Sequence, residues 1–118
     1  MMYVLTAVNA LAALLSGASS IAGAVRPSLG LTTSEPVTSG MLLYARAYTA
    51  RALPLSVVAL VLLARQEWTV LAPFLIVLGL AQVGDSVLGA QRRNVGQAVG
   101  AGVGAVIHLV SAVWLYTH

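Results

Sequence analysis

The chain has 118 residues, of which 59% are hydrophobic and only 8% are charged, and its mean hydropathy is +0.94. Soluble domains carry roughly 25% charged residues, so this composition predicts an integral membrane protein. The net charge of +3 comes from six scattered arginines, which argues against a nucleic-acid-binding face, and the absence of cysteine excludes disulfides, thiolate catalysis and cysteine-ligated metal centres.

Four apolar segments follow one another along the chain, at residues 4–25, 40–64, 68–90 and 96–116. Each has about 20 residues or more, which at a rise of about 1.5 Å per residue is enough to cross a hydrocarbon layer of about 30 Å. The sequence therefore predicts an all-α fold, in which residues 1–118 form a single antiparallel bundle of four transmembrane helices.

The connections between these segments set the topology. The first connection, residues 26–39, is the longest, and within it Ser34-Glu35-Pro36 is typical of a helix start. The turn at residues 65–67 is short, so we expect the second and third helices to be antiparallel neighbours. Three arginines lie on the side of the first and third connections and one lies on the other side. The positive-inside rule then places both termini outside the cytoplasm, most simply across a bacterial plasma membrane.

Two arginines inside the second segment need acceptors, because a charge near the bilayer centre costs at least about 2.5–3.5 kcal/mol. Of the three acids in the chain, only Asp85 lies well inside an apolar segment. Counted inward from the arginine-rich side at 1.5 Å per residue, Arg46 and Asp85 lie roughly 8–9 Å deep, and Arg51, Gln82 and His108 lie roughly 12–17 Å deep. Depth thus favours Arg46 as the partner of Asp85. The helix face that Arg51 shares with Tyr48 favours Arg51, and we expect Arg51 to form the ion pair.

Each predicted helix also presents one stripe of polar or small residues at helical spacing. The stripes are Asn9, Ala13, Ser16 and Ser20 on the first helix; Tyr44, Tyr48 and Arg51 on the second; Gln82, Asp85 and Gly89 on the third; and Gly96, Gly100, Gly104 and His108 on the fourth. The glycine repeat permits close backbone approach, within the monomer or across an oligomer. We expect a homo-oligomer, most simply a dimer. Because His108 and Asp85 lack a second histidine at ligand spacing, no metal is expected, and no sequence feature implies a cofactor.

The pattern of Ala45-Arg46…Arg51, Gly84-Asp85-Ser86…Gly89 and His108 resembles a family of small bacterial and fungal membrane proteins. That family has a four-helix domain of unknown function and is distantly similar to DoxX-like proteins. The resemblance covers nearly the whole chain and implies the four-helix fold without assigning an activity. Small multidrug-resistance transporters have a similar size but carry a glutamate in their first helix. The first predicted helix here contains no acid, which argues against drug–proton antiport.

Three functions are compatible with these residues. The first is a cofactor-free membrane enzyme that performs acid/base chemistry, such as isomerisation, cyclisation or epoxide opening, on a lipophilic small molecule. Its catalytic residues would be Asp85, Arg51 and His108, and the residues binding its substrate would be Asn9, Tyr48, Gln82, Arg46 and Tyr44. The alternatives are a small transporter or channel subunit that uses the buried Arg–Asp pair, and an accessory subunit in which the pair is structural. A pocket that reaches lipid sideways would favour the enzyme, whereas a pathway open to water would favour transport.

Overall fold

The computed structural model describes residues 2–26 and 38–118, and this part of the chain folds into four α-helices. They are α1 (Met2–Val25), α2 (Ser39–Ala64), α3 (Trp68–Gln91) and α4 (Val95–Thr117). Their bounds lie within two residues of the predicted ones. All four helices are long and apolar enough to cross a membrane. The fold is all-α and the protein is an integral membrane protein, as its composition predicted.

The start of α2 is set by a cap residue. The side chain of Thr38 accepts a hydrogen bond from the backbone N–H of Met41 at 3.1 Å, which satisfies one of the N–H groups left open at a helix start. The motif at residues 34–36, which predicted a helix start, lies outside the described residues.

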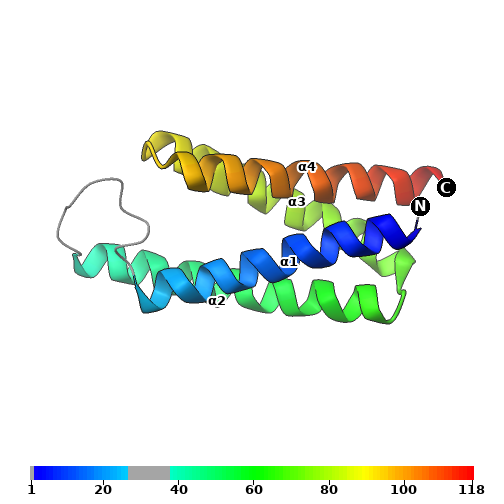
Figure 1. Ribbon diagram of the computed structural model, residues 1–118, viewed down its shortest axis with the longest axis horizontal. Coiled ribbons are helices and arrows are strands. Elements are labelled where there is room, and N and C mark those ends of the chain that lie inside the picture. Colours follow the sequence, from blue (N-terminus) through cyan, green and yellow to red (C-terminus); the bar gives the residue numbers. More distant parts are fainter. Residues whose placement is uncertain (1, 27–37) are drawn as a thin grey trace.

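The four helices pair as two hairpins. α1 packs along α2 and α3 packs along α4, whereas α2 meets α3, and α1 meets α4, over much shorter lengths. Figure 1 shows that the hairpins come together at the end that holds both termini and diverge toward the opposite end. The termini therefore lie on one side of the molecule, as an even number of crossings requires.

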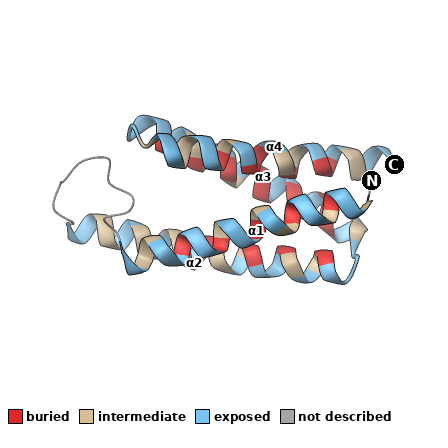
Figure 2. Cartoon of the chain, in the orientation of Figure 1, coloured by how far each residue is buried: buried red, intermediate tan, exposed pale blue. Residues whose placement is uncertain are grey.

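The shared hydrophobic core sits at the termini end. It is built from buried leucines and alanines of all four helices: Leu5, Ala13, Ala59, Leu63, Leu71, Leu75, Leu78 and Ala112. By contrast, the first half of α2 contains no buried residue, since its buried positions begin at Ala52. Figure 2 shows this uneven distribution of burial along the hairpins. The end of the molecule away from the termini is consequently the less tightly packed end.

The two short turns close in the same way, although neither contains glycine. Gln66 and Arg93 adopt left-handed backbone conformations, with φ of 54° and 56°. In each turn the next residue donates its N–H to the carbonyl five residues earlier: Glu67 to Leu62 at 3.1 Å, and Asn94 to Gly89 at 2.8 Å. These bonds satisfy the last carbonyls of α2 and α3 and reverse the chain within three residues.

The α3–α4 hairpin depends on a close backbone approach at Gly89. A Cβ atom placed on Gly89 would lie only 2.7 Å from the backbone nitrogen of Ala98. Two hydrogen bonds cross the same contact, from Ser86 Oγ to the Ala98 carbonyl at 2.7 Å and from Gln97 Nε2 to the Asp85 carbonyl at 3.0 Å. Small-residue packing and interhelical hydrogen bonds are the usual sources of helix association in lipid.

We predict that Gly89→Ala destabilises the protein while Gly84→Ala does not. Both changes gain up to about 1 kcal/mol of helix propensity. Only Gly89 adds an overpacking penalty of about 1–3 kcal/mol, because a Cβ at Gly84 meets no heavy atom within 4 Å. Thermal unfolding in detergent, followed by circular dichroism, should give a lower midpoint for Gly89→Ala and an unchanged or higher one for Gly84→Ala. Equal shifts would contradict the close contact.

Candidate functional site

The central ion pair joins α2 to α3. Arg51 Nη2 lies 2.6 Å from Asp85 Oδ1, so the prediction that Arg51 pairs with Asp85 is confirmed. The Asp85 side chain is almost enclosed, with 9% of its surface exposed, whereas 43% of the Arg51 side chain is exposed. The arginine faces a hollow of about 420 Å³ between the two helices, which is also lined by Tyr44 and Tyr48. The charges are thus matched, and the cationic partner remains accessible from this hollow.

Two tyrosines of α2 stack with arginines. The Arg51 guanidinium carbon lies 5.3 Å from the centroid of the Tyr48 ring, and that of Arg92 lies 5.2 Å from the centroid of the Tyr44 ring. Both distances are within the range of cation–π attraction. Because Arg92 follows the end of α3, its contact with Tyr44 is a second link between the hairpins at their diverging ends.

A larger groove runs between the two hairpins, with a volume of about 890 Å³. Its edges are formed by apolar side chains that are more than half exposed: Leu11 and Leu15 on α1, and Val103 on α4. The groove therefore opens sideways between α1 and α4, toward the hydrocarbon of the bilayer. Its volume lies within the ~300–1,000 Å³ typical of ligand sites.

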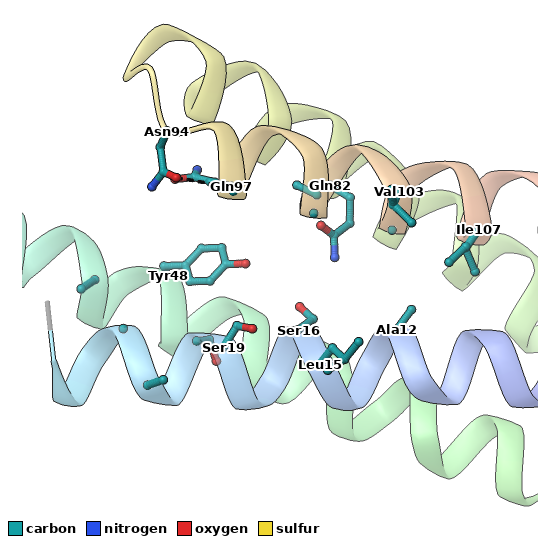
Figure 3. A pocket seen from close by; sticks show the side chains of 18 of the residues that line it. Ala12, Leu15, Ser16, Ser19, Tyr48, Gln82, Asn94, Gln97, Val103 and Ile107 are labelled. Atoms are coloured by element: carbon teal, nitrogen blue, oxygen red, sulfur yellow. Dashed lines mark hydrogen bonds between the residues drawn. The ribbon is translucent and has the colours of Figure 1, made fainter. Parts of the chain in front are cut away.

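Polar groups gather on the groove wall between these apolar edges. Figure 3 shows Tyr48 of α2, Ser16 of α1 and Gln82 of α3 pointing into the same space. Tyr48 directs its hydroxyl toward Ser16. A phenol both donates and accepts hydrogen bonds, and the Gln82 amide offers one acceptor and two donors. An otherwise apolar groove with a few converging polar groups is the usual composition of a small-molecule site.

The groove is closed at the termini end by a buried cluster of Asn9, His108 and Ser111. Asn9 Nδ2 donates to the Leu5 carbonyl at 2.8 Å and to Ser111 Oγ at 2.7 Å, and Asn9 Oδ1 lies 2.8 Å from His108 Nδ1. Since a carbonyl only accepts, the bond to Leu5 fixes the orientation of the Asn9 amide. Its oxygen then faces His108, so the Nδ1 atom of His108 carries a hydrogen and donates it. The cluster ties α1 to α4.

The predicted catalytic residues occupy two separate places. Asp85 contacts Arg51, and its carbonyl accepts from Gln97, whereas His108 lies eleven residues further along α4, about 16 Å along the helix axis. The structure therefore does not bring His108 to the ion pair. Asn9, a predicted substrate-binding residue, is likewise held in the closed cluster, with only 1% of its surface exposed. These two residues form a joint between helices and line neither hollow.

Of the remaining predicted substrate-binding residues, three line the groove and one does not. Tyr44, Tyr48 and Gln82 line the groove. Arg46 is exposed and lines neither the groove nor the smaller hollow, because it points away from the face of α2 that carries Tyr48. The helical rotation of about 100° per residue, which separates Arg46 from Arg51, accounts for this difference.

The glycine stripe of α4 borders the groove, where Gly96 and Gly100 are exposed and Gly104 is buried. Gly96 and Gly100 line the groove, and a Cβ atom on Gly104 would lie 3.3 Å from the Gln82 side chain. Its small residues thus leave space within the monomer and admit Gln82. The homo-oligomer, which the stripe was expected to support, stays a prediction.

Some residues of these sites were not singled out from the sequence. Ser111 follows His108 by three residues, so helical spacing alone places it on the same face. Gln97 lies near the start of α4, where its side chain reaches the Asp85 carbonyl. Thr49 Oγ1 donates to the Ser20 carbonyl of α1 at 2.6 Å. Serine and threonine are common in membrane helices, so their presence gave no signal for these contacts.

A scan against protein-family models, a search of curated proteins and a search of solved structures each found no match. The resemblance to a four-helix family of unknown function therefore stays a prediction. The fold and the groove define the protein as a four-helix integral membrane protein with an interhelical cavity, and its function is inferred from that geometry.

We predict that Asn9 and His108 are energetically coupled. Asn9→Ala leaves the Nδ1–H of His108 without its acceptor, which for a buried polar group costs about 1–3 kcal/mol. His108→Ala should lower the free energy of unfolding less in the Asn9→Ala variant than in the wild type. The difference, which is the coupling free energy between the two residues, should be about 0.5–3 kcal/mol. Unfolding of the two single variants and the double variant in detergent measures this. Ser19→Ala, at an exposed position of α1, serves as the control. Strictly additive effects would contradict the joint.

Proposed function

We propose that this protein is a cofactor-free membrane enzyme that performs acid/base chemistry on a lipophilic small molecule bound in the groove. The observation that carries the proposal is the shape of the groove, which opens sideways toward lipid and bears the Tyr48 hydroxyl on its wall. A lipophilic molecule can enter such a site from the bilayer without crossing water. Isomerisation, cyclisation and epoxide opening all need a proton donor or acceptor at a fixed place in a dry pocket.

The residues have distinct roles in this proposal. Tyr48 exchanges a proton with the bound molecule, because it carries a titratable hydroxyl that points into the groove in Figure 3. Arg51 lies over the Tyr48 ring and stabilises the negative charge that develops there during the transfer. Asp85 holds Arg51 in place through their 2.6 Å contact and acts as a positioning residue. Gln82 orients the substrate from the opposite wall.

The alternative functions are less well supported. The groove lining ends at Val8 and Ile107, beside the closed cluster of Asn9 and His108, so it does not continue to the termini end of the molecule. This favours a binding site over a transport pathway. A structural role for the Arg51–Asp85 pair has one observation in its favour, namely that Asp85 lines the small hollow and not the groove.

We predict that Tyr48→Phe abolishes turnover without unfolding the protein. The substitution removes only the hydroxyl, and loss of a positioned proton donor lowers rates by about 10²–10⁴-fold. Purified protein would be incubated with a lipid extract of its host membrane. Chromatography with mass spectrometry would then follow compounds that change retention at constant mass, or that gain one water. Tyr3→Phe, at a highly exposed position, is the matched control and should retain turnover.

Two outcomes would contradict this proposal. One is that no compound changes in the presence of folded wild-type protein. The other is a folded, fully active variant with both Arg51→Leu and Asp85→Leu, because it would show that the ion pair contributes only to packing. Replacing both partners together avoids leaving one charge unpaired, a change that by itself costs about 3–5 kcal/mol when the site is buried.

We also propose that the protein lies in a bacterial plasma membrane with both termini outside the cytoplasm. Arg26, Arg92 and Arg93 lie at the diverging end of the hairpins and Arg65 lies at the termini end, which favours this orientation by the positive-inside rule.

Single cysteines test this orientation, because the natural chain has none. Glu67→Cys lies at the termini end and Gln91→Cys at the diverging end, and both positions are exposed. In intact cells, a membrane-impermeant maleimide should label Glu67→Cys and should label Gln91→Cys only after the cells are opened. The reverse pattern would show the opposite orientation.

A further inference from the structure

The mouth of the groove, at the diverging end of the hairpins, carries a positive charge. Arg92 lines the groove there, next to Tyr44, whose ring lies beneath its guanidinium group. In the described part of the chain, the only carboxylates within salt-bridge distance of an arginine are Asp85, beside Arg51, and Glu67, beside Arg65. Arg92 thus has no carboxylate partner among these residues. Its stacking on Tyr44 holds the guanidinium plane in place and leaves its edge available for an anion.

Beyond this mouth the groove is long, and apart from polar groups such as Tyr48, Ser16 and Gln82 its lining is mostly apolar. The α4 wall runs from Gly96 to Ile107, about 16 Å along the helix axis at 1.5 Å per residue. The facing wall of α1 contributes Val8, Leu11 and Leu15. A site with a cation at one end and an apolar channel behind it is complementary to an amphiphile with an anionic head and a hydrocarbon chain.

We propose that the occupant of the groove is an anionic amphiphile, whose phosphate or carboxylate head is held by Arg92 and whose chain lies along α1 and α4. This inference rests on the proposed function and adds the class of its substrate. Tyr48 lies one helical turn deeper than Tyr44, about 6 Å along α2. The reacting group of the substrate is therefore close to the head, near the first carbons of the chain.

The charge part of the proposal is tested by the binding of four probes to the full-length protein in mild detergent, measured by native mass spectrometry. Dioleoyl phosphatidic acid and oleic acid carry phosphate and carboxylate heads, and dioleoylglycerol and oleyl alcohol are their uncharged counterparts. We expect at least one anionic probe to bind about tenfold or more tightly than its counterpart, which is the size of a charged hydrogen bond. Comparison of the two anionic probes tells whether a phospholipid or a free fatty acid supplies the head.

A pair of adjacent arginines gives a matched control for the head-group contact. Arg92→Gln should abolish the preference for the anionic probe, whereas Arg93→Gln should keep it, because Arg93 does not line the groove. Both variants remove one positive charge from the same end of the molecule. Glutamine also suits the left-handed backbone at Arg93, since Gln66 adopts the same conformation in the other turn, with φ of 54°.

The position of the chain is tested by filling the groove. Gly100 lines the groove and a Cβ atom there would meet no heavy atom within 4 Å, so we expect Gly100→Leu to fill part of the groove and to weaken binding of every probe about tenfold or more. Val99→Leu adds volume on the exposed neighbouring position and should bind like the wild type.

Three results would overturn the inference, and they differ from those that would overturn the enzyme. Equal binding of charged and uncharged probes would contradict the anionic head group of the proposed substrate, whereas Tyr48-dependent turnover would be unaffected by that result. Equal loss in Arg92→Gln and Arg93→Gln would show general attraction to the positive end of the molecule. A dimer that excludes all four probes, and that Gly100→Leu converts to monomer, would show that a second copy fills the groove. The proposed enzyme fails separately if Tyr48→Phe keeps its turnover.

Discussion

The hydrocarbon of a bilayer offers no hydrogen-bond partner, so every polar group inside a transmembrane helix must find one within the protein. In the described part of this chain, no buried side-chain nitrogen or oxygen lacks a hydrogen-bond partner. The partners come largely from neighbouring helices. Arg51 with Asp85 joins α2 to α3, and Asn9 with His108 and Ser111 joins α1 to α4. Together with the common core at the termini end, these two polar joints place the hairpins relative to each other.

The groove follows from this arrangement. Each hairpin is packed internally, the second of them through the close approach at Gly89, so neither needs the other along its whole length. The common core and the joint at Asn9 lie toward the termini, whereas Arg51 with Asp85 lies nearer the diverging end. Between them the small residues of α4 add no side-chain volume. A chain of 118 residues can in this way form an open groove of about 890 Å³, while the buried side-chain polar groups of its described part keep their hydrogen-bond partners.

The sequence predicted the four helices because a continuous apolar run of membrane-spanning length permits little else in lipid. It also predicted the Arg51–Asp85 pair, because the chain has only three acids and one of them lies deep in a segment. It did not predict that His108 would be separate from this pair. The depths counted along the predicted helices placed His108 and Arg51 at a similar distance from the membrane surface. Depth alone, however, does not determine which helices are neighbours. His108 faces Asn9 because α4 meets α1 on that side. The lateral opening could not be predicted either, since it depends on how far the two hairpins diverge.

Three polar sites, namely the Asn9–His108–Ser111 cluster, the Arg51–Asp85 pair and Tyr48, differ in how accessible they are to a bound molecule. The Asn9–His108–Ser111 cluster is fully enclosed and its donors and acceptors are already matched, so it has no room for a substrate. Asp85 is also enclosed and is committed to Arg51. Tyr48 is placed differently, because it lines both the groove and the smaller hollow. Its ring contacts the arginine of the ion pair while its hydroxyl points into the groove. A change of charge on the Tyr48 hydroxyl therefore acts electrostatically on Arg51 across the ring. Tyr48 in this way connects the Arg51–Asp85 ion pair to the groove that a ligand can enter.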